Sequence, residues 1–431
     1  MYILYNSILF AASFFILPYF LLKMVFTGKY RKSIVQKLGG RQRQILTNLA
    51  DGPRVWIHAV SVGEVTAAAP IVASLKLQRP EIKIIFSTST ETGQLMARRL
   101  VSGADAFIYF PLDIPFVVRK MIRLAKPAVF VMVETELWPN FLKACKLNSV
   151  KVLMVNGRVS PRSYDKYLRT RYFWKMVLAD IITAGMIAQV DASRIESIGM
   201  TQDRIEVLGN AKYDALAAMA EPELYKEIAQ RVNVRAGERF FVAGSTHPGE
   251  DQIVVRVYQQ LLKHHPDFKL IIVPRHVERT AAIRELLQSA GLPDVITMSE
   301  INNGETRSKE RVLIVDVIGE LLKIYSLATI VYCGGSLVPK GGQNILEAAA
   351  WGKVIFYGPS MEDFSEEKAL LEDVGCGVTI KNEQELLQEI LQLLEIPEEL
   401  EKRGARGKAV VAANMGAAVR YAEMIGREIG G

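Results

Sequence analysis

The feature that most constrains the fold is a regular alternation of short apolar runs and amphipathic segments, which begins near Asp51 and continues almost to the C-terminus. Each short apolar run is typical of a buried parallel strand, and the segments between the runs have the residue spacing of helices. This alternation predicts parallel sheets covered by helices on both faces. At 431 residues, the chain is expected to contain two or three domains.

A first series of strands and helices fills residues 51–212, which we expect to form one Rossmann-like domain. Its strands are expected at Arg54–Val60, Ile82–Thr88, Ala106–Phe110, Ala128–Val133, Lys151–Val155, Ile181–Gln189 and Arg204–Leu208. Its helices are expected at Val65–Gln78, Gly93–Val101, Phe116–Ala125, Asn140–Leu147 and Asp165–Asp180. A loop over Gly209–Glu221 leads to the second series.

The second series lies within residues 213–431, which we expect to form a second Rossmann-like domain. Its strands are expected at Arg239–Ala243, Lys269–Val273, Asp294–Met298, Arg311–Val315, Thr329–Cys333, Val354–Tyr357 and Val378–Ile380. Its helices are expected at Gln252–His264, Thr280–Ala290, Glu320–Leu327, Asn344–Trp351 and Glu366–Val374, followed by helices from Glu383 with breaks near Pro397 and Gly404. Two doubly wound domains predict ligand sites at the carboxyl ends of their strands, in a cleft between the domains.

The first 50 residues differ from the rest of the chain in charge. They contain seven basic residues, all after position 22, and no acidic one, so the remaining 46 basic residues equal the 46 acidic residues. The apolar run before the basic cluster is long enough to span a bilayer and lacks the features of a cleaved signal peptide. We therefore expect a membrane anchor at residues 1–26 and a basic juxtamembrane segment at 27–50, with the domains on the cytoplasmic side of an inner membrane. Pro18 leaves a shallow interfacial segment as an alternative.

Composition also excludes several classes of site. The neutral remainder of the chain argues against a broad nucleic-acid-binding face. The three cysteines have no metal-ligand spacing, no Asp-x-Asp pair follows a predicted strand, and no G-x-G-x-x-G fingerprint is present. We therefore predict neither a bound metal nor a dinucleotide cofactor.

A glycine-rich stretch, Gly334–Gly352, follows the predicted strand at Thr329–Cys333. Glycines allow the backbone to approach a ligand closely, and a helix that begins after them would present free N–H groups to an anion such as a phosphate. Asn344 and Glu347 are three residues apart and would share one face of that helix. An ordinary strand–loop–helix connection with a solvated Glu347 is the alternative.

Carboxylates and cations follow other predicted strands. Glu64 comes after the first strand, where it is either a general base or a residue that complements the dipole of the next helix. Glu134 and Glu136 follow the strand at Ala128–Val133. They are either a pair of metal ligands or one functional residue beside one structural residue. Lys212 and Arg275 are candidate anion ligands, although a lysine in a linker is often only solvated.

Together these motifs resemble the 3-deoxy-D-manno-octulosonic acid (Kdo) transferases over essentially the whole chain. The resemblance rests on Ser61-Val62-Gly63-Glu64, Glu134-Thr135-Glu136-Leu137-Trp138-Pro139-Asn140, Asn156-Gly157-Arg158, Gly244-Ser245-Thr246-His247, Pro274-Arg275-His276 and Gly341-Gly342-Gln343-Asn344-Ile345-Leu346-Glu347. It implies an inverting glycosyltransferase of the GT-B type that moves Kdo from CMP-Kdo to a lipid A precursor.

The resemblance also implies roles for individual residues. Glu64 would be the catalytic base, and Glu134 and Lys212 would stabilise the transition state. The CMP-binding residues would be Pro274, Arg275, Ile318, Gly319, Glu320, Asn344, Ile345, Leu346 and Glu347. Val133 and Gln343 depart from the residues common in the family, but both only flank these positions. A GT-B transferase that uses a UDP-sugar, or a membrane-tethered nucleotide-binding protein without activity, remains the alternative.

Overall fold

A computed structural model describes residues 2–11, 31–40 and 42–429 of the protein. The chain forms two compact units, one of Met1–Ala215 with Met415–Gly431 and the other of Leu216–Asn414. The second domain predicted from the sequence at 213–431 therefore ends earlier than expected. Helix α21 (Ala417–Ile429) packs on α4 (Val62–Gln78) of the first unit instead.

The first unit is built on a seven-stranded parallel sheet. Its strands are β1 (Arg54–His58), β2 (Lys83–Thr88), β3 (Ala106–Tyr109), β4 (Val129–Val133), β5 (Lys151–Gly157), β6 (Thr183–Met186) and β7 (Ile205–Val207). They lie in the order β3-β2-β1-β4-β5-β6-β7, and β1 pairs with both β2 and β4. The strand order reverses between β1 and β4, which is where doubly wound folds bind ligands.

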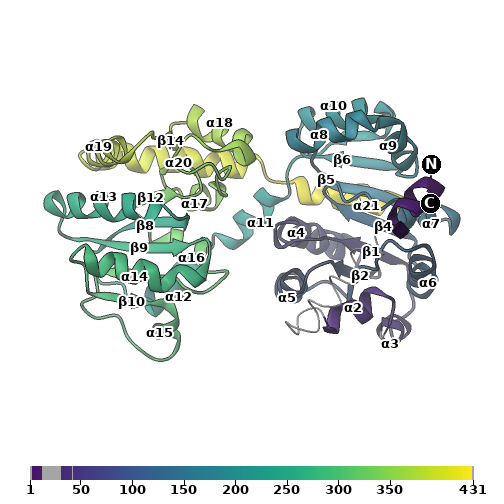
Figure 1. The fold of residues 1–431 in the computed structure, drawn as a ribbon, viewed down its shortest axis with the longest axis horizontal. Coiled ribbons are helices and arrows are strands. Elements are labelled where there is room, and N and C mark those ends of the chain that lie inside the picture. Colours follow the sequence, from purple (N-terminus) through teal and green to yellow (C-terminus); the bar gives the residue numbers. More distant parts are fainter. Residues whose placement is uncertain (1, 12–30, 41, 430–431) are drawn as a thin grey trace. The chain divides into compact units, whose positions relative to one another are not determined.

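Helices cover both faces of this sheet (Figure 1). They are α2 (Arg31–Lys37), α3 (Gln42–Thr47), α4, α5 (Glu91–Leu100), α6 (Pro115–Ala125), α7 (Pro139–Leu147), α8 (Pro161–Arg169), α9 (Arg171–Leu178), α10 (Gln189–Ile198) and α21. Helix α11 (Lys212–Met219) begins in the first unit and ends in the second. Successive side chains of β1 point to opposite faces of the sheet, which explains why helices pack on both faces. Val55 and Ile57 enter one buried cluster with α4, α5 and α21, whereas Trp56 enters the other with α6, α7 and α9.

Three predicted elements of the first unit were wrong. The helix expected at Asp165–Asp180 is two helices, because the hydroxyl of Thr170 bonds back to the carbonyl of Lys166 and the chain breaks at Thr170. The strand expected at Ile181–Gln189 stops at Met186, and Gln189 starts α10. The loop expected at Gly209–Glu221 contains α11.

The second unit repeats the architecture. Its strands are β8 (Arg239–Thr246), β9 (Phe268–Pro274), β10 (Val295–Thr297), β11 (Val312–Ile314), β12 (Ile330–Cys333), β13 (Ile355–Tyr357) and β14 (Gly377–Thr379), in the parallel order β10-β11-β9-β8-β12-β13-β14. Its helices are α12 (Pro222–Arg231), α13 (Glu250–His264), α14 (Thr280–Ser289), α15 (Met298–Asn302), α16 (Leu321–Leu327), α17 (Leu346–Ala350), α18 (Ser365–Asp373), α19 (Glu383–Leu394) and α20 (Pro397–Ala413). Here the order reverses between β8 and β12. Both predicted Rossmann-like sheets are thus confirmed.

The helix break expected near Gly404 is also wrong. Gly404 lies inside α20, where a Cβ atom would meet the carbonyl oxygen of Gly352 at 1.9 Å. Glycine is therefore needed at this position for close packing of the helix on the loop after α17, and not for a turn. The break near Pro397 is confirmed, because α20 begins at that residue.

The predicted anchor at residues 1–26 lies largely outside the described residues. Residues 2–11 are helical and contact the first unit through Tyr2, Tyr5 and Asn6. Within the described ranges, no helix has both the length and the apolar character needed to cross a membrane.

Candidate functional site

Glu64 lies directly after β1, at the point where the strand order of the first sheet reverses. Ser61 caps α4, and its side chain accepts a hydrogen bond from the backbone N–H of Glu64 at 3.4 Å. The carboxylate of Glu64 accepts in return from the hydroxyl of Ser61 at 2.8 Å and from the N–H of Val60 at 2.7 Å. This reciprocal arrangement resembles a capping box and fixes the carboxylate at the carboxyl edge of the sheet.

Glu64 is only 6% exposed. Burial, reinforced by the negative charge of Glu134, raises the pKa of Glu64 to about 7, although its bonds from Val60 and Ser61 oppose this rise. The group therefore accepts a proton near neutral pH, which is the property expected of a general base. The helix-start contacts of Glu64 are thus observed, and its role as a general base stays a prediction.

Glu134 and Lys212 form an ion pair beside this site. Glu134 ends β4 in a left-handed conformation, with φ of 59°, and its Oε1 atom lies 2.9 Å from the Nζ atom of Lys212. Lys212 begins α11, and the side chain of Asn156 at the end of β5 holds that segment by accepting from the N–H of Ala211 at 2.9 Å. Asn156, part of the Asn156-Gly157-Arg158 motif, thus positions Lys212.

Glu136 is a third carboxyl group at this edge. Burial and the charges of Glu64 and Glu134 raise the pKa of Glu136 to about 7. The hydroxyl of Thr135 donates to the carbonyl of Arg158 at 2.5 Å and fixes the turn. The sequence left a metal pair, or one functional and one structural residue, open for Glu134 and Glu136; in the structure Glu134 forms an ion pair with Lys212. Among the residues described, no group of three or more His, Cys, Asp or Glu side chains is arranged to hold a metal ion.

The glycine loop after β12 is organised by Glu250, the first residue of α13. Its fully buried carboxylate accepts hydrogen bonds of 2.7–3.1 Å from five donors. The donors are the N–H groups of His247, Gly335, Ser336 and Leu337 and the hydroxyl of Tyr332. The N–H groups of this part of the loop are thus occupied by a carboxylate of the protein, and the phosphate site expected at the start of the following helix stays a prediction.

The helix expected at Asn344–Trp351 is shorter than expected and begins at Leu346. The side chain of Asn344 accepts from the N–H of Leu346 at 3.1 Å and donates to the carboxylate of Glu347 at 3.2 Å. Burial raises the pKa of Glu347 to about 7. The predicted pairing of Asn344 with Glu347 on one side of the helix start is thus observed, with Ile345 and Leu346 buried beneath.

Pro274 and Arg275 lie beside the first strand of the second sheet. The N–H of Arg275 donates to the carbonyl of Thr246 at 3.0 Å, and Arg275 is exposed. The ring of His247 lies 6.0 Å from that of His276, between centroids, and its Nδ1 atom donates to the carbonyl oxygen of Ser245 at 3.1 Å. Arg275 and two imidazoles therefore gather at the carboxyl ends of β8 and β9.

The third predicted binding segment precedes α16. Ile318 is 80% exposed, and Gly319 adopts a φ of 90°, which favours glycine. The carboxylate of Glu320 is mostly buried and lies 3.3 Å from the guanidinium of Arg231 on α12. The side chain of Glu320 thus braces α16 against α12, while Ile318 and Gly319 remain at the surface.

Ser61 and Asn156 support the candidate residues of the first unit, Glu250 supports those of the second, and sequence reasoning gave none of the three a role. Ser61 was recognisable, since Ser-x-x-Glu before an apolar helix is the signature of a capping box. Glu250 follows His-Pro-Gly at a helix start, but its five donors come from three separate segments. No local sequence pattern predicts such a set of contacts.

Comparisons with known proteins agree on one family. Residues 32–215 match the family described as 3-deoxy-D-manno-octulosonic-acid transferase (kdotransferase). The chain is 29% identical over 426 residues to the 3-deoxy-D-manno-octulosonic acid transferase of Haemophilus influenzae, covering 98% of this chain and 97% of that protein. It is 28% identical over 413 residues to the enzyme of the same name from Chlamydia muridarum, covering 94% and 92%.

A solved glycosyltransferase from Rickettsia africae has a similar fold, with a TM-score of 0.56 and 16% identity, covering 88% of this chain and 99% of that chain. At this identity the likeness concerns the fold alone. It agrees with the two Rossmann-like sheets of the GT-B architecture.

We predict that Glu250→Gln destabilises the second unit. The amide keeps the volume but replaces one acceptor oxygen with a donor, so buried N–H groups lose their partners, at a cost of about 2–4 kcal/mol. Urea unfolding of the full chain measures the loss. Glu398→Gln, at an 87% exposed side chain, is the matched control and should leave the unfolding curve unchanged. Equal curves for the two variants would contradict the role of Glu250.

Proposed function

The chain belongs to the Kdo transferase family, and from this premise we propose that it is an inverting glycosyltransferase that moves Kdo from CMP-Kdo to a lipid A precursor. It is a Kdo glycosyltransferase of lipopolysaccharide biosynthesis. The observation that carries the catalytic assignment is the buried carboxyl of Glu64, held at the switch point of the first sheet with a pKa of about 7.

In the proposed reaction the first unit activates the acceptor. A sugar hydroxyl attacks the anomeric carbon of Kdo, the bond from that carbon to the phosphate oxygen breaks, and CMP leaves with the electron pair. Glu64 takes the hydroxyl proton as the new glycosidic bond forms. The ammonium of Lys212, oriented by Glu134 at 2.9 Å, stabilises the negative charge that develops in the transition state. Because the displacement is direct, no covalent sugar–enzyme intermediate forms.

The second unit would bind the donor. Glu347 and Asn344 are placed to hydrogen-bond the ribose, and Arg275 is placed to bind the phosphate of CMP. The neighbouring Pro274, Ile318, Gly319 and Glu320, with buried Ile345 and Leu346, would complete the nucleotide site. Since CMP carries one phosphate, an arginine and backbone N–H groups supply much of the charge compensation that a diphosphate would need.

The acceptor also suggests where the enzyme works. A lipid A precursor is acylated and anionic, so we propose that the catalytic domains lie at the cytoplasmic side of the inner membrane. The apolar N-terminal segment and the seven basic residues of positions 1–50 support this location.

Direct assay tests the proposed activity. The full chain, incubated with CMP-Kdo and a tetra-acylated lipid A precursor, should yield products heavier by one or more Kdo residues, with release of CMP. Mass spectrometry of the lipid identifies them. Transfer from a UDP-sugar, with none from CMP-Kdo, would support the alternative GT-B transferase and contradict the proposal.

Glu64→Gln should lower turnover by at least about 10²-fold, because the amide keeps the size and hydrogen bonds of the side chain but accepts no proton. CMP affinity should not change, since the proposed nucleotide site lies in the other unit. Initial rates and calorimetry with CMP measure both effects. Glu91→Gln, at another glutamate in the first turn of a helix, is the control. If Glu64→Gln turns over like this control, Glu64 acts only as a cap.

A further inference from the structure

The segment that carries Lys212 runs from Leu208 to Asp214, between β7 and the first turn of α11. Helix α11 has eight residues, and a helix this short is only marginally stable without contacts from elsewhere in the protein. The ammonium of Lys212 lies at the end of a flexible side chain, so its ion pair with Glu134 at 2.9 Å requires a fixed backbone at this point. Contacts from outside α11 therefore have to hold its first turn in place.

Part of this support is local. The side chain of Asn210 accepts from the N–H of Lys212 at 3.0 Å, and the carbonyl of Asn210 accepts from the N–H of Tyr213 at 3.1 Å. The side chain of Asn156 accepts from the N–H of Ala211 at 2.9 Å. These bonds satisfy N–H groups that the start of a helix leaves without partners.

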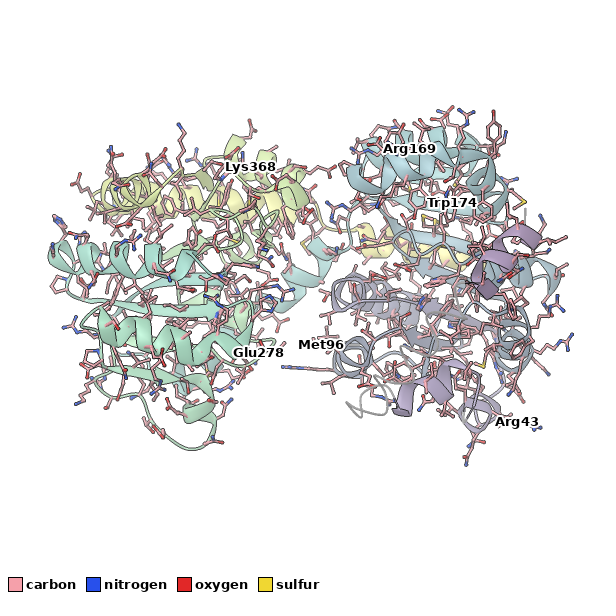
Figure 2. All side chains as sticks on the ribbon, viewed as in Figure 1. Arg43, Met96, Arg169, Trp174, Glu278 and Lys368 are labelled. Atoms are coloured by element: carbon pink, nitrogen blue, oxygen red, sulfur yellow. The ribbon has the colours of Figure 1, made fainter. Side chains whose placement is uncertain are left out.

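The other support comes from α21, at the opposite end of the chain. Helix α21, the yellow helix among the side chains of the first unit in Figure 2, enters the apolar cluster of α4 and β5 through its buried side chains. The carboxylate of Asp214 accepts from the N–H of Gly416 at 2.7 Å and from the N–H of Ala418 at 3.2 Å. An aspartate distant in the sequence thus satisfies the N–H groups at the start of α21, as an N-cap residue usually does.

Two further side chains of α21 bind the same segment. The Nε atom of Arg420 donates to the carbonyl of Leu208 at 2.9 Å, and the hydroxyl of the buried Tyr421 donates to the carbonyl of Gly209 at 2.8 Å. Gly209 adopts a φ of 90°, and a Cβ atom there would lie 3.0 Å from the guanidinium of Arg420. Helix α21 therefore holds the segment before Lys212 as well as after it.

We propose that Asp214 is a positioning residue for Lys212. By tying the first turn of α11 to the start of α21, the carboxylate of Asp214 keeps the ammonium of Lys212 at Glu134. All three residues and helix α21 belong to the first unit. The part that Lys212 plays in transfer rests on the proposed function, whereas the attachment of its segment to α21 does not.

The alternative is that Asp214 only stabilises α21, and the electrostatics of the site distinguish the two roles. Lys212 is a cation beside the carboxyl groups of Glu64, Glu134 and Glu136. Burial and the charge of Glu134 raise the pKa of Glu64 to about 7. If the ammonium moves away, the charge of Glu134 is less compensated and the pKa of Glu64 rises further. A loss of helix stability alone leaves this pKa unchanged.

Carbon-13 titration of the Glu64 carboxyl in the glutamate-labelled full chain tests the proposal without any transfer of Kdo. Lys212→Met removes the cation and should raise the titration midpoint by at least about half a pH unit. Asp214→Ala should raise it in the same direction, because two N–H groups of α21 lose their acceptor and the first turn of α11 is released. A natural midpoint in Asp214→Ala, or in Asp214→Asn if only that milder variant folds, would overturn the proposal.

Turnover shows whether Asp214 acts through Lys212. Asp214→Ala should lower kcat by at least about tenfold and leave CMP affinity unchanged, since a misplaced catalytic group slows the reaction. The same substitution should have no further effect on kcat in a Lys212→Met chain, because the contribution of Lys212 is already lost. Multiplied losses in the double variant would overturn the proposal. If the natural chain transferred no Kdo, the proposed function would fail, and the titration would still decide whether Asp214 positions Lys212.

Arg427→Gln is the matched control on the same helix. The guanidinium of Arg427 lies 2.8 Å from the carboxylate of Glu206, at the other end of α21 from Asp214. Its loss should leave both the Glu64 midpoint and kcat unchanged. A shift as large as that of Asp214→Ala would show that any loosening of α21 has this effect, and would contradict a specific role for Asp214.

Discussion

In both halves of the protein, a glutamate satisfies backbone N–H groups at the place where the strand order of a parallel sheet reverses. Such groups lie beyond the strand ladder, and leaving them buried without partners is costly. After β1, Glu64 accepts from one N–H group and one hydroxyl. After β8, Glu250 accepts from four N–H groups and one hydroxyl. The position is the same, but the number of donors differs.

The number of donors distinguishes a structural glutamate, Glu250, from one that is suited to proton transfer, Glu64. The five hydrogen bonds that Glu250 accepts connect the start of α13 to the glycine loop after β12. Gly334 fits that junction because a Cβ atom there would lie 2.6 Å from the carbonyl of Ser245. Glu64 has few donors for its charge and lies near Glu134, so its proton affinity is high and its carboxylate is suited to accept a proton. The pair of Glu134 and Lys212 beside it adds a cation to a site that would otherwise contain only carboxyl groups.

The sequence predicted what depends on local pattern. Both parallel sheets, the position of Glu64 after β1 and the pairing of Asn344 with Glu347 follow from periodicity and spacing. The sequence did not predict contacts between segments that lie far apart in the chain. Nothing nearby in the sequence reveals that the carboxylate of Glu250 accepts from the N–H groups of Gly335 and Ser336. The ion pair of Glu134 with Lys212, which is 78 residues away, is likewise not set by local sequence spacing. Helix α21 returns to the first unit, where Asp214 accepts from the N–H of Gly416 at 2.7 Å, a contact that no local pattern in either segment indicates.

The central claim is that the ionisation of Glu64 controls acceptor activation. It is tested most directly by carbon-13 NMR titration of glutamate-labelled protein, with the Glu64 carboxyl signal assigned by its absence from Glu64→Gln. The account predicts a midpoint near pH 7 for this signal, and a kcat/KM for the transfer that rises with pH through the same midpoint. A midpoint near the ordinary glutamate value of about 4.3, or a rate that does not follow the titration of Glu64, would contradict it.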